Sequence, residues 1–150
     1  MKKWFYFIFV LVFVCCDNTI PTEEPRPEAQ IEVRAFYVKE SESSKYPDVG
    51  SQVFIFYDIY ENIHYSYEEG GILIDNRNGN RITPDQQSVI DGFGETIIIP
   101  KYTDRKFHII VASNYYPGRL GYVSYTERAF EQAFSTSENG IIRYTITYYP

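Results

Sequence analysis

The amino-acid sequence predicts an all-β domain, and three observations support that prediction. From Ile31 onward, apolar residues recur at every second position, the period of a half-buried strand. Turn-forming residues interrupt this pattern about every 8 to 12 residues, a spacing typical of a β-sandwich or a small barrel. Tyrosine accounts for 15 of the 150 residues, and isoleucine and valine are also abundant, which favours strands. We expect a β-sandwich of roughly seven or eight strands over residues 31–150.

The predicted strands are runs of alternating apolar residues. In residues 53–59, Val53 and Ile55 lie on one face and Phe54 and Phe56 on the other, so we expect both faces of this strand to be covered. The predicted strands cover residues 31–37, 53–59, 71–74, 95–99, 107–112, 120–125 and 142–148, with 81–83 as a short return strand and 88–90 leading into a turn.

Local residues predict the connections between these strands. Residues 41–50 are expected to form a loop with its turn at Tyr46-Pro47-Asp48, and residues 61–69 a polar loop. Asn78-Gly79 predicts a two-residue hairpin because both residues tolerate positive φ. Residues 91–94, Asp-Gly-Phe-Gly, predict another tight reversal.

One segment breaks the period of two. Within residues 126–134, Phe130, Ala133 and Phe134 fall at helical spacing, and Thr126 can cap a helix that follows it. We therefore predict one short helix near residues 126–134.

Two segments resemble the prealbumin-like (transthyretin-like) modules of bacterial surface proteins. Residues 47–53, Pro-Asp-Val-Gly-Ser-Gln-Val, form a turn leading into a long strand, and residues 89–97 are similar to the hairpin Thr-Asp-x-x-Gly-x-hydrophobic of that family. The sequence departs from the family at Ile90, where threonine is usual. The resemblance covers residues 46–110 and implies an immunoglobulin-like or prealbumin-like β-sandwich, but no activity.

The N-terminal residues predict export. Met1-Lys2-Lys3 precedes thirteen apolar residues, Trp4–Cys16, which as a helix would span about 20 Å, too short for a hydrocarbon core of roughly 30 Å. The run ends in two cysteines, so residues 1–16 resemble a bacterial lipoprotein signal, which is cut before a lipid-bearing cysteine. A conventional signal peptide with incidental cysteines is the alternative.

The anchor residue is expected to be Cys16, since Cys15 is smaller than Val14 at the position before the cut; Cys15 remains the alternative anchor. Residues 1–15 would then be removed. Residues 16–30 are polar, acidic and rich in proline, which indicates an extended tether between the membrane and the domain at residues 31–150.

Charge and cysteine content limit the possible partners. Removing residues 1–15 takes away two lysines and no acids, which moves the formal charge from −6 to −8. So acidic a chain has no electrostatic attraction for nucleic acid. With Cys16 at the mature N-terminus, no internal disulfide is possible. Attachment to the membrane would depend on the covalent lipid.

The residues offer little catalytic chemistry. His64 and His108 are the two histidines, and we expect each to face solvent or to be hydrogen-bonded within the fold. Gly-x-Ser-x-Gly, His-Glu-x-x-His and phosphate-binding glycine motifs are missing from the sequence. Hydrolytic transthyretin relatives end in Tyr-Arg-Gly-Ser, whereas residues 144–150 read Tyr-Thr-Ile-Thr-Tyr-Tyr-Pro. We therefore expect that the protein is not an enzyme and binds no cofactor.

A metal site is not expected either. Residues 75–80, Asp-Asn-Arg-Asn-Gly-Asn, have a faint likeness to a calcium loop. Arg77, however, occupies the third position, where such a loop needs an oxygen ligand. A turn accounts for these residues.

Tyrosines outside the strand pattern are the remaining candidates for ligand binding. An exposed tyrosine can stack on a sugar ring or anchor a protein partner. A neighbouring arginine can stack or pair with a carboxylate. For Tyr115 and Tyr116, packing over the open end of the sandwich is the alternative role. The candidate residues are Tyr65, Tyr67, Tyr115, Tyr116 and Arg119.

These observations predict a non-enzymatic binding or structural module in the bacterial cell envelope, lipid-anchored and expected at the outer membrane. One alternative is a carbohydrate-binding accessory lipoprotein that uses the exposed tyrosines. Another is a subunit of a larger envelope assembly that contacts a protein partner through a strand edge.

Overall fold

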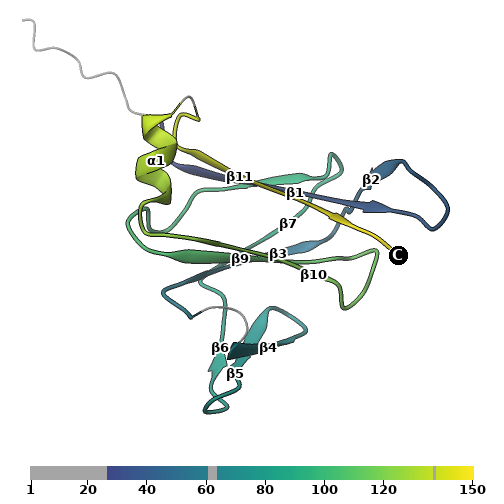
Figure 1. Cartoon of the computed structure of the whole chain (residues 1–150), viewed down its shortest axis with the longest axis horizontal. Helices are drawn as coiled ribbons and strands as arrows, with labels where there is room; N and C mark the ends of the chain where they lie inside the picture. Colours follow the sequence, from purple (N-terminus) through teal and green to yellow (C-terminus); the bar gives the residue numbers. More distant parts are fainter. Residues whose placement is uncertain (1–26, 61–63, 137) are drawn as a thin grey trace, which may run out of the picture.

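The computed structural model describes residues 27–60, 64–136 and 138–150, and its architecture confirms the predicted all-β sandwich (Figure 1). The predicted signal, Cys16 and most of the predicted tether lie outside the described residues. The described residues form one α-helix, α1 (Ala129–Ser135), and eleven strands: β1 (Gln30–Val38), β2 (Lys45–Pro47), β3 (Gln52–Tyr57), β4 (Tyr65–Glu68), β5 (Ile72–Asp75), β6 (Arg81–Ile82), β7 (Gln86–Val89), β8 (Glu95–Ile98), β9 (Phe107–Ala112), β10 (Leu120–Tyr125) and β11 (Ile141–Tyr148).

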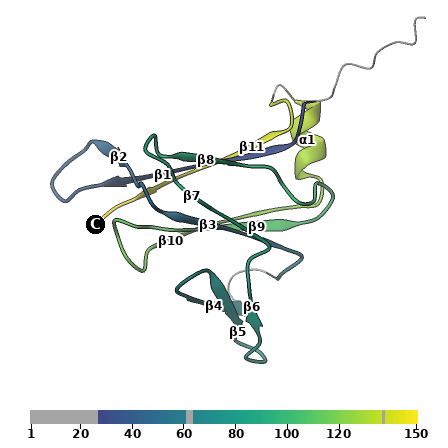
Figure 2. The ribbon, with the colours of Figure 1, turned by 180° about the vertical axis from the view of Figure 1, so that it is seen from behind.

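Two sheets lie face to face and form the sandwich (Figures 1 and 2). Sheet A has the strand order β11-β1-β2, with β8 also paired to β1, and sheet B has the order β10-β9-β3-β7. Strand β1 pairs in parallel with β11, while its other edge pairs antiparallel with β8 and then with β2. Both sheets end in edge strands and do not close on themselves, so the fold is a sandwich and not a barrel.

The core lies between sheets A and B and is built from alternate residues of their strands. Ile31, Val33 and Ala35 of β1 have no exposed surface, and the same holds for Val53 and Ile55 of β3. Burying one such aliphatic side chain as large as valine or isoleucine contributes about 1.5–3 kcal/mol. The alternation in the sequence therefore marks the core-facing side of each strand.

A third, smaller sheet covers the outer face of sheet B. This sheet C has the order β4-β5-β6 and lies below β3 and β9 in Figure 1. Phe54 and Phe56 of β3 point toward it and are 2% and 0% exposed, packed with Leu73 of β5 and Ile110 of β9. Both faces of β3 are covered, as its two apolar faces predict.

Two strands occupy segments that the sequence predicts to be loops. β2 lies within residues 41–50 and pairs with the end of β1, so that Tyr37 lies opposite Tyr46. β4 lies within residues 61–69 and pairs with β5, with Tyr67 opposite Leu73. β2 has three residues and β4 has four, so neither is long enough for a period of two to stand out in the sequence, and the formation of each depends on its partner strand.

The hairpin between β5 and β6 is wider than the predicted two-residue turn. The Asp75 N–H donates to the Asn80 carbonyl oxygen over 2.8 Å, and the Gly79 N–H donates to the Asp75 carbonyl oxygen over 2.7 Å. Within Asn78-Gly79, positive φ occurs at Gly79 (74°) but not at Asn78. The Asp75 carboxylate organises the loop instead, because it accepts hydrogen bonds from the backbone N–H and the guanidinium of Arg77.

The tight reversal at residues 91–94 is present, but it joins two sheets instead of two paired strands. The Gly94 N–H donates to the Asp91 carbonyl oxygen over 3.1 Å, and the Asp91 N–H donates to the Glu95 carbonyl oxygen over 3.0 Å. The strand before it, β7, pairs with β3 of sheet B, and the strand after it, β8, pairs with β1 of sheet A. The reversal thus carries the chain across the sandwich.

The predicted helix is present but begins later than expected. Its N-cap residue is Arg128, which makes no side-chain capping bond, so the predicted cap at Thr126 is wrong. Phe130 and Ala133 face the core at 1% and 8% exposure, whereas Phe134 is 42% exposed. Nowhere in the described part of the chain is a helix both long and apolar enough to span a membrane.

Candidate functional site

The predicted binding tyrosines lie in two separate places. Tyr115 and Tyr116 belong to an aromatic cluster at one end of the sandwich, completed by Tyr37 of β1 and Tyr46 of β2. The Tyr115 ring stacks on the Tyr37 ring with centroids 3.7 Å apart and planes 8° apart, and Tyr116 meets Tyr115 edge-on at 4.9 Å. The Tyr116 hydroxyl donates to the Val38 carbonyl oxygen over 2.7 Å. The cluster thus covers the open end of the sandwich.

Buried Asp48 holds the loop that carries these rings. Its carboxylate is 1% exposed and accepts hydrogen bonds from the Ser113 hydroxyl at 2.5 Å and from the Tyr115 N–H at 2.9 Å. The Ser113 hydroxyl in turn accepts from the Tyr116 N–H at 2.9 Å. Two hydrogen bonds to Asp48 and one to Ser113 therefore fix the start of the connection between β9 and β10.

The other two predicted tyrosines, Tyr65 and Tyr67, lie on β4 of sheet C, away from the aromatic cluster. Their rings are partly buried against the apolar residues that join sheets B and C. The Tyr65 hydroxyl accepts from the Tyr60 N–H at 3.2 Å, and the Tyr67 ring lies 6.2 Å from the Phe54 ring, tilted by 51°. Sheet C therefore presents Tyr67 beside sheet B.

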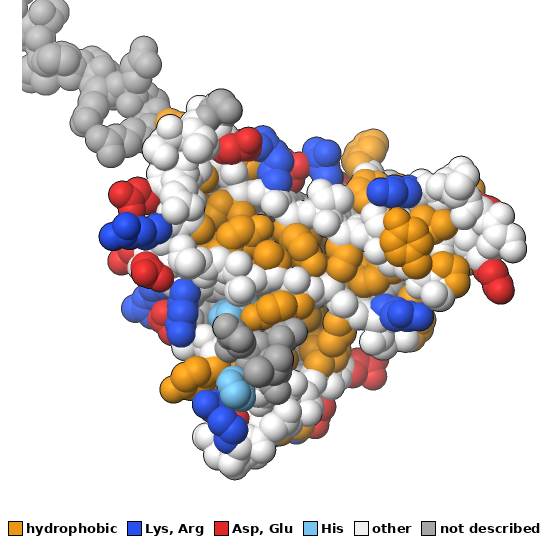
Figure 3. Space-filling view, viewed as in Figure 1, with side chains coloured by type: hydrophobic (Ala, Val, Ile, Leu, Met, Phe, Trp, Pro, Cys, Tyr) orange, Lys and Arg blue, Asp and Glu red, His pale blue; other side chains and the backbone are white. Residues whose placement is uncertain are grey.

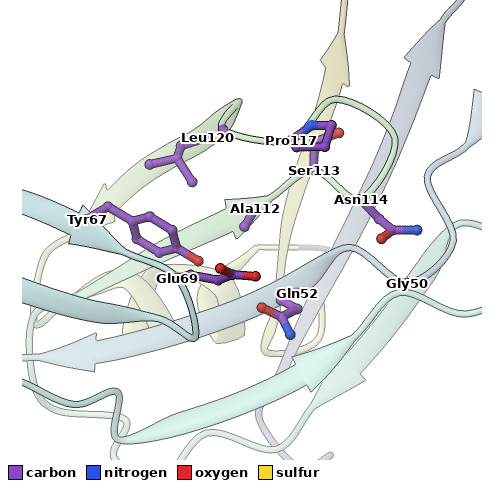
Figure 4. Close-up of a pocket in the computed structure, with 10 residues that line it drawn as sticks. Gly50, Gln52, Tyr67, Glu69, Ala112, Ser113, Asn114, Pro117 and Leu120 are labelled. Carbon is purple, nitrogen blue, oxygen red and sulfur yellow. The ribbon is translucent and has the colours of Figure 1, made fainter.

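A cavity of about 470 Å³ opens between sheets B and C next to Tyr67, and we call it the interlayer cleft (Figure 4). Three segments meet there: the start of β3, the turn after β4, and the connection between β9 and β10. The described residues that line the cleft are Gly50, Gln52, Tyr67, Glu69, Ala112, Ser113, Asn114, Pro117, Gly118 and Leu120.

Polar groups line the cleft from three separate segments, one strand and two connections. Asn114 is held by its Nδ2, which donates to the Val49 carbonyl oxygen over 3.0 Å, so its Oδ1 remains as an acceptor. Gln52 of β3 is exposed and carries both a donor and an acceptor. Glu69 adds a carboxylate from the turn between β4 and β5. Of the described residues that line the cleft, Glu69 alone is charged.

The Tyr67 hydroxyl stays protonated at neutral pH. Burial raises the pKa of Tyr67 above its usual value, and the neighbouring Glu69 carboxylate raises it further. The phenol can therefore donate as well as accept a hydrogen bond. On the far side of Tyr67 and Leu120 lies a smaller apolar hollow of about 120 Å³, lined also by Tyr65, Leu73, Ile110 and Tyr122.

The sequence-predicted residues are only partly brought together. Tyr67 lines the cleft, but Tyr115, Tyr116 and Arg119 do not. Arg119 is exposed, and its backbone N–H donates to the Tyr116 carbonyl oxygen over 3.0 Å. The cleft also uses Gln52, Asn114 and Leu120, which sequence reasoning missed because only the pairing of distant strands brings them near Tyr67. Glu69 lies two positions after Tyr67, but no local pattern marks it as part of a binding site.

The histidines lie elsewhere. His108 of β9 is 4% exposed; its Nε2 donates to the Ile59 carbonyl oxygen over 3.2 Å, and its Nδ1 lies 2.5 Å from the Tyr122 hydroxyl. Since a carbonyl oxygen only accepts, the contact with Ile59 places a proton on Nε2. His64 meets the Tyr60 ring edge-on at 6.1 Å. Neither histidine lines the interlayer cleft.

In residues 75–80, the segment with a faint likeness to a calcium loop, the carboxylate of Asp75 is bound by Arg77. Arg77 donates from Nε and Nη2 to the two Asp75 carboxylate oxygens, at 2.9 and 2.6 Å. Hydrogen bonds from the Arg77 side chain, and then from its backbone N–H, lower the pKa of Asp75 to about 2. No group of three or more His, Cys, Asp or Glu side chains suited to a metal ion occurs among the residues that the structure describes.

Comparison with known proteins finds no matching family model, no matching curated protein and no matching solved structure. The resemblance of residues 46–110 to prealbumin-like modules therefore stays a prediction.

Proposed function

We propose that this protein is a lipid-anchored component of the bacterial cell envelope, expected at the outer membrane, that acts as a non-enzymatic binding module. A small ligand would occupy the interlayer cleft. The N-terminal sequence supports the anchor, and the structure of the described domain supports the binding role.

The interlayer cleft is the observation on which the binding role rests. Its volume of about 470 Å³ lies within the range of roughly 300–1,000 Å³ that small-molecule sites occupy. Tyr67 and Leu120 supply apolar surface, while Gln52, Glu69 and Asn114 supply polar atoms. A few polar groups converging on an apolar wall are typical of ligand sites.

Binding is tested by adding a mixed library of small molecules to the full-length, isotope-labelled protein and recording its amide NMR spectrum. Sugars, amino acids, organic acids and amines should all be included. We expect at least one class to shift the signals of Ala112, Asn114 and Leu120 while those of α1 stay unchanged. A library that leaves the three cleft signals in place would contradict the binding role.

The anchor is tested by labelling cells with a radioactive fatty acid. The wild-type protein should incorporate label and sediment with outer membranes, and Cys16→Ala should abolish the label. Cys15→Ala is the matched control and should keep it. The opposite pattern would identify Cys15 as the anchor, and an unlabelled wild-type protein would exclude lipidation.

A second candidate function is that of a subunit in an envelope assembly. The edge strands β10 and β11 lie on the same side of the sandwich, and a band of hydrophobic side chains runs between them (Figure 3). Partly buried Val123, Tyr125, Tyr144 and Ile146 flank this seam. Such an open edge suits the addition of a partner strand.

The assembly role is tested with a photocrosslinking residue in living cells. Exposed Ser124 of β10 and Thr145 of β11 are suitable positions, and exposed Gln87 of β7 serves as the control on the opposite edge. One adduct of defined mass at both test positions and not at Gln87 supports the role. Crosslinks absent at Ser124 and Thr145 would argue against it.

A further inference from the structure

We infer that the ligand of the interlayer cleft is a neutral saccharide whose ring packs against Tyr67; this inference rests on the binding role proposed above. A saccharide needs two things from a protein: apolar surface for the C–H groups of its ring, and hydrogen-bonding groups for its hydroxyls. The cleft provides both, from residues of β3, β4 and β10 and of the connections beside them.

The apolar surface is formed by Tyr67 and Leu120 on neighbouring walls. Tyr67 is held in place by its contact with Phe54 and its position in β4, so little side-chain freedom is lost when a ligand binds. Leu120, at the start of β10, is 41% exposed. In Figure 4 both side chains extend toward the same space. A tyrosine ring gives a large contact area at a small entropic cost.

The hydrogen-bonding groups match hydroxyls, each of which donates once and accepts twice. The side-chain amide of Gln52 offers a donor and an acceptor, and this side chain makes no hydrogen bond to the other residues that the structure describes. The Asn114 Oδ1 and the Glu69 carboxylate add acceptors. The Tyr67 hydroxyl can act either way. A ligand with several hydroxyl groups satisfies this mixture without carrying charge.

The charge of the cleft argues against anionic ligands. None of the described lining residues is Lys, Arg or His, the side chains that usually hold phosphate or carboxylate. Glu69 would repel such groups. The same argument excludes acidic sugars and phosphorylated nucleosides from this site, and it leaves neutral sugars as the class with the best chemical fit.

The experiment is a glycan array probed with the full-length protein in a detergent that carries no sugar headgroup. The array should contain neutral oligomers of glucose, galactose, mannose and N-acetylglucosamine, beside acidic and phosphorylated ones. Hits are then titrated by calorimetry. We expect binding to one or more neutral oligomers, with no binding to the acidic or phosphorylated ones.

Two variants locate the site. Tyr67→Ala should weaken binding at least tenfold, which corresponds to about 1.4 kcal/mol. Gln52→Ala removes an exposed side chain that makes no hydrogen bond to the other described residues, and a loss of affinity of about threefold to tenfold is expected. Tyr115→Ala, in the aromatic cluster, is the matched control and should change affinity less than twofold. Thermal unfolding followed by circular dichroism verifies that each variant is folded.

The outcomes separate this inference from the proposed function. If the array shows no neutral sugar while another class of compound shifts the cleft signals in the NMR experiment, the saccharide inference is wrong and the binding role stands. A second outcome is that sugars bind and that Tyr115→Ala abolishes binding, while Tyr67→Ala and Gln52→Ala leave it intact. The sugar site would then be the aromatic cluster, and the inference would be wrong about the location. Binding of amines in place of sugars at Glu69 would also overturn it.

Discussion

Asp48 and Ser113 lie 65 positions apart in the sequence, and the Ser113 hydroxyl donates to the buried Asp48 carboxylate over 2.5 Å. This contact joins the turn before β3 to the residues after β9. It brings both segments to the rim of the interlayer cleft, because Ser113 is a lining residue and Asn114 follows it. The stability of the domain and the shape of the cleft therefore depend on the same carboxylate.

Replacing Asp48 tests that dependence. Asp48→Ala leaves the Ser113 hydroxyl and the Tyr115 N–H without their acceptor, and each buried group without a partner costs about 1–3 kcal/mol. We expect the free energy of unfolding in urea to fall by about 3 kcal/mol. Asp91→Ala is the control, since Asp91 accepts two backbone N–H groups in an exposed turn, and it should cost about 1 kcal/mol or less. Equal losses in the two variants would contradict the prediction.

Gly70 and Gly71 form a matched pair in the turn between β4 and β5. Both have positive φ, 85° and 84°, so alanine at either position costs about 1–3 kcal/mol in backbone strain. A Cβ at Gly71 would also lie 2.3 Å from the Phe54 ring, whereas a Cβ at Gly70 meets nothing within 4 Å. We expect Gly71→Ala to be less stable than Gly70→Ala by about 1–3 kcal/mol. Urea unfolding of the two variants measures this difference.

The pair Asp75–Arg77 makes stability depend on acid. The pKa of Asp75 is lowered to about 2 in the fold, while an unfolded aspartate titrates near the usual value of about 3.9. Its stabilising contribution is thus complete above about pH 4 and is lost as the pH falls toward 2. We expect the difference in unfolding free energy between wild type and Asp75→Asn to be constant from pH 5 to 7 and to shrink below pH 4. A difference that persists at pH 2 would rule out this ion pair as its source.

The two phenylalanines of α1 should differ in their importance. Phe130 is 1% exposed and stacks on Phe107 at 5.6 Å, while Phe134 is 42% exposed. Removing a buried phenylalanine costs about 3–5 kcal/mol. Phe130→Ala should lower the unfolding free energy by that amount, and Phe134→Ala by clearly less. Thermal unfolding of both variants decides the comparison, and similar losses would show that α1 does not seal the core through Phe130.

The strands that local pattern predicts best are those with a strongly apolar sequence. The predicted strands 107–112 and 120–125 coincide with β9 and β10, because the first five residues of β9 are all buried and because a loop rich in turn-forming residues separates the two strands. β4 was missed for the opposite reason. Its residues, Tyr-Ser-Tyr-Glu, form a strand only because β5 pairs with them and the outer face of sheet B needs cover.

The cleft could be predicted from the sequence only in part. Tyr67 stands out as a tyrosine in a polar segment, and that signal was sufficient to name it. Gln52 and Asn114 carry no comparable signal. They meet because β3 pairs antiparallel with β9 so that Gln52 lies opposite Ala112, a register that no local pattern reveals.

The parallel pair of β1 and β11 has a consequence for folding. Glu32 and Arg143, which face each other across this pair, are separated by 111 positions, and their side chains meet at 3.3 Å. Sheet A cannot be completed until all the residues between them have been synthesised, and contacts of such long range make folding slow, in the range of about milliseconds to seconds for all-β sandwiches. Until then β1 exposes an unpaired edge, and the nascent polypeptide is at risk of aggregation unless a chaperone shields it.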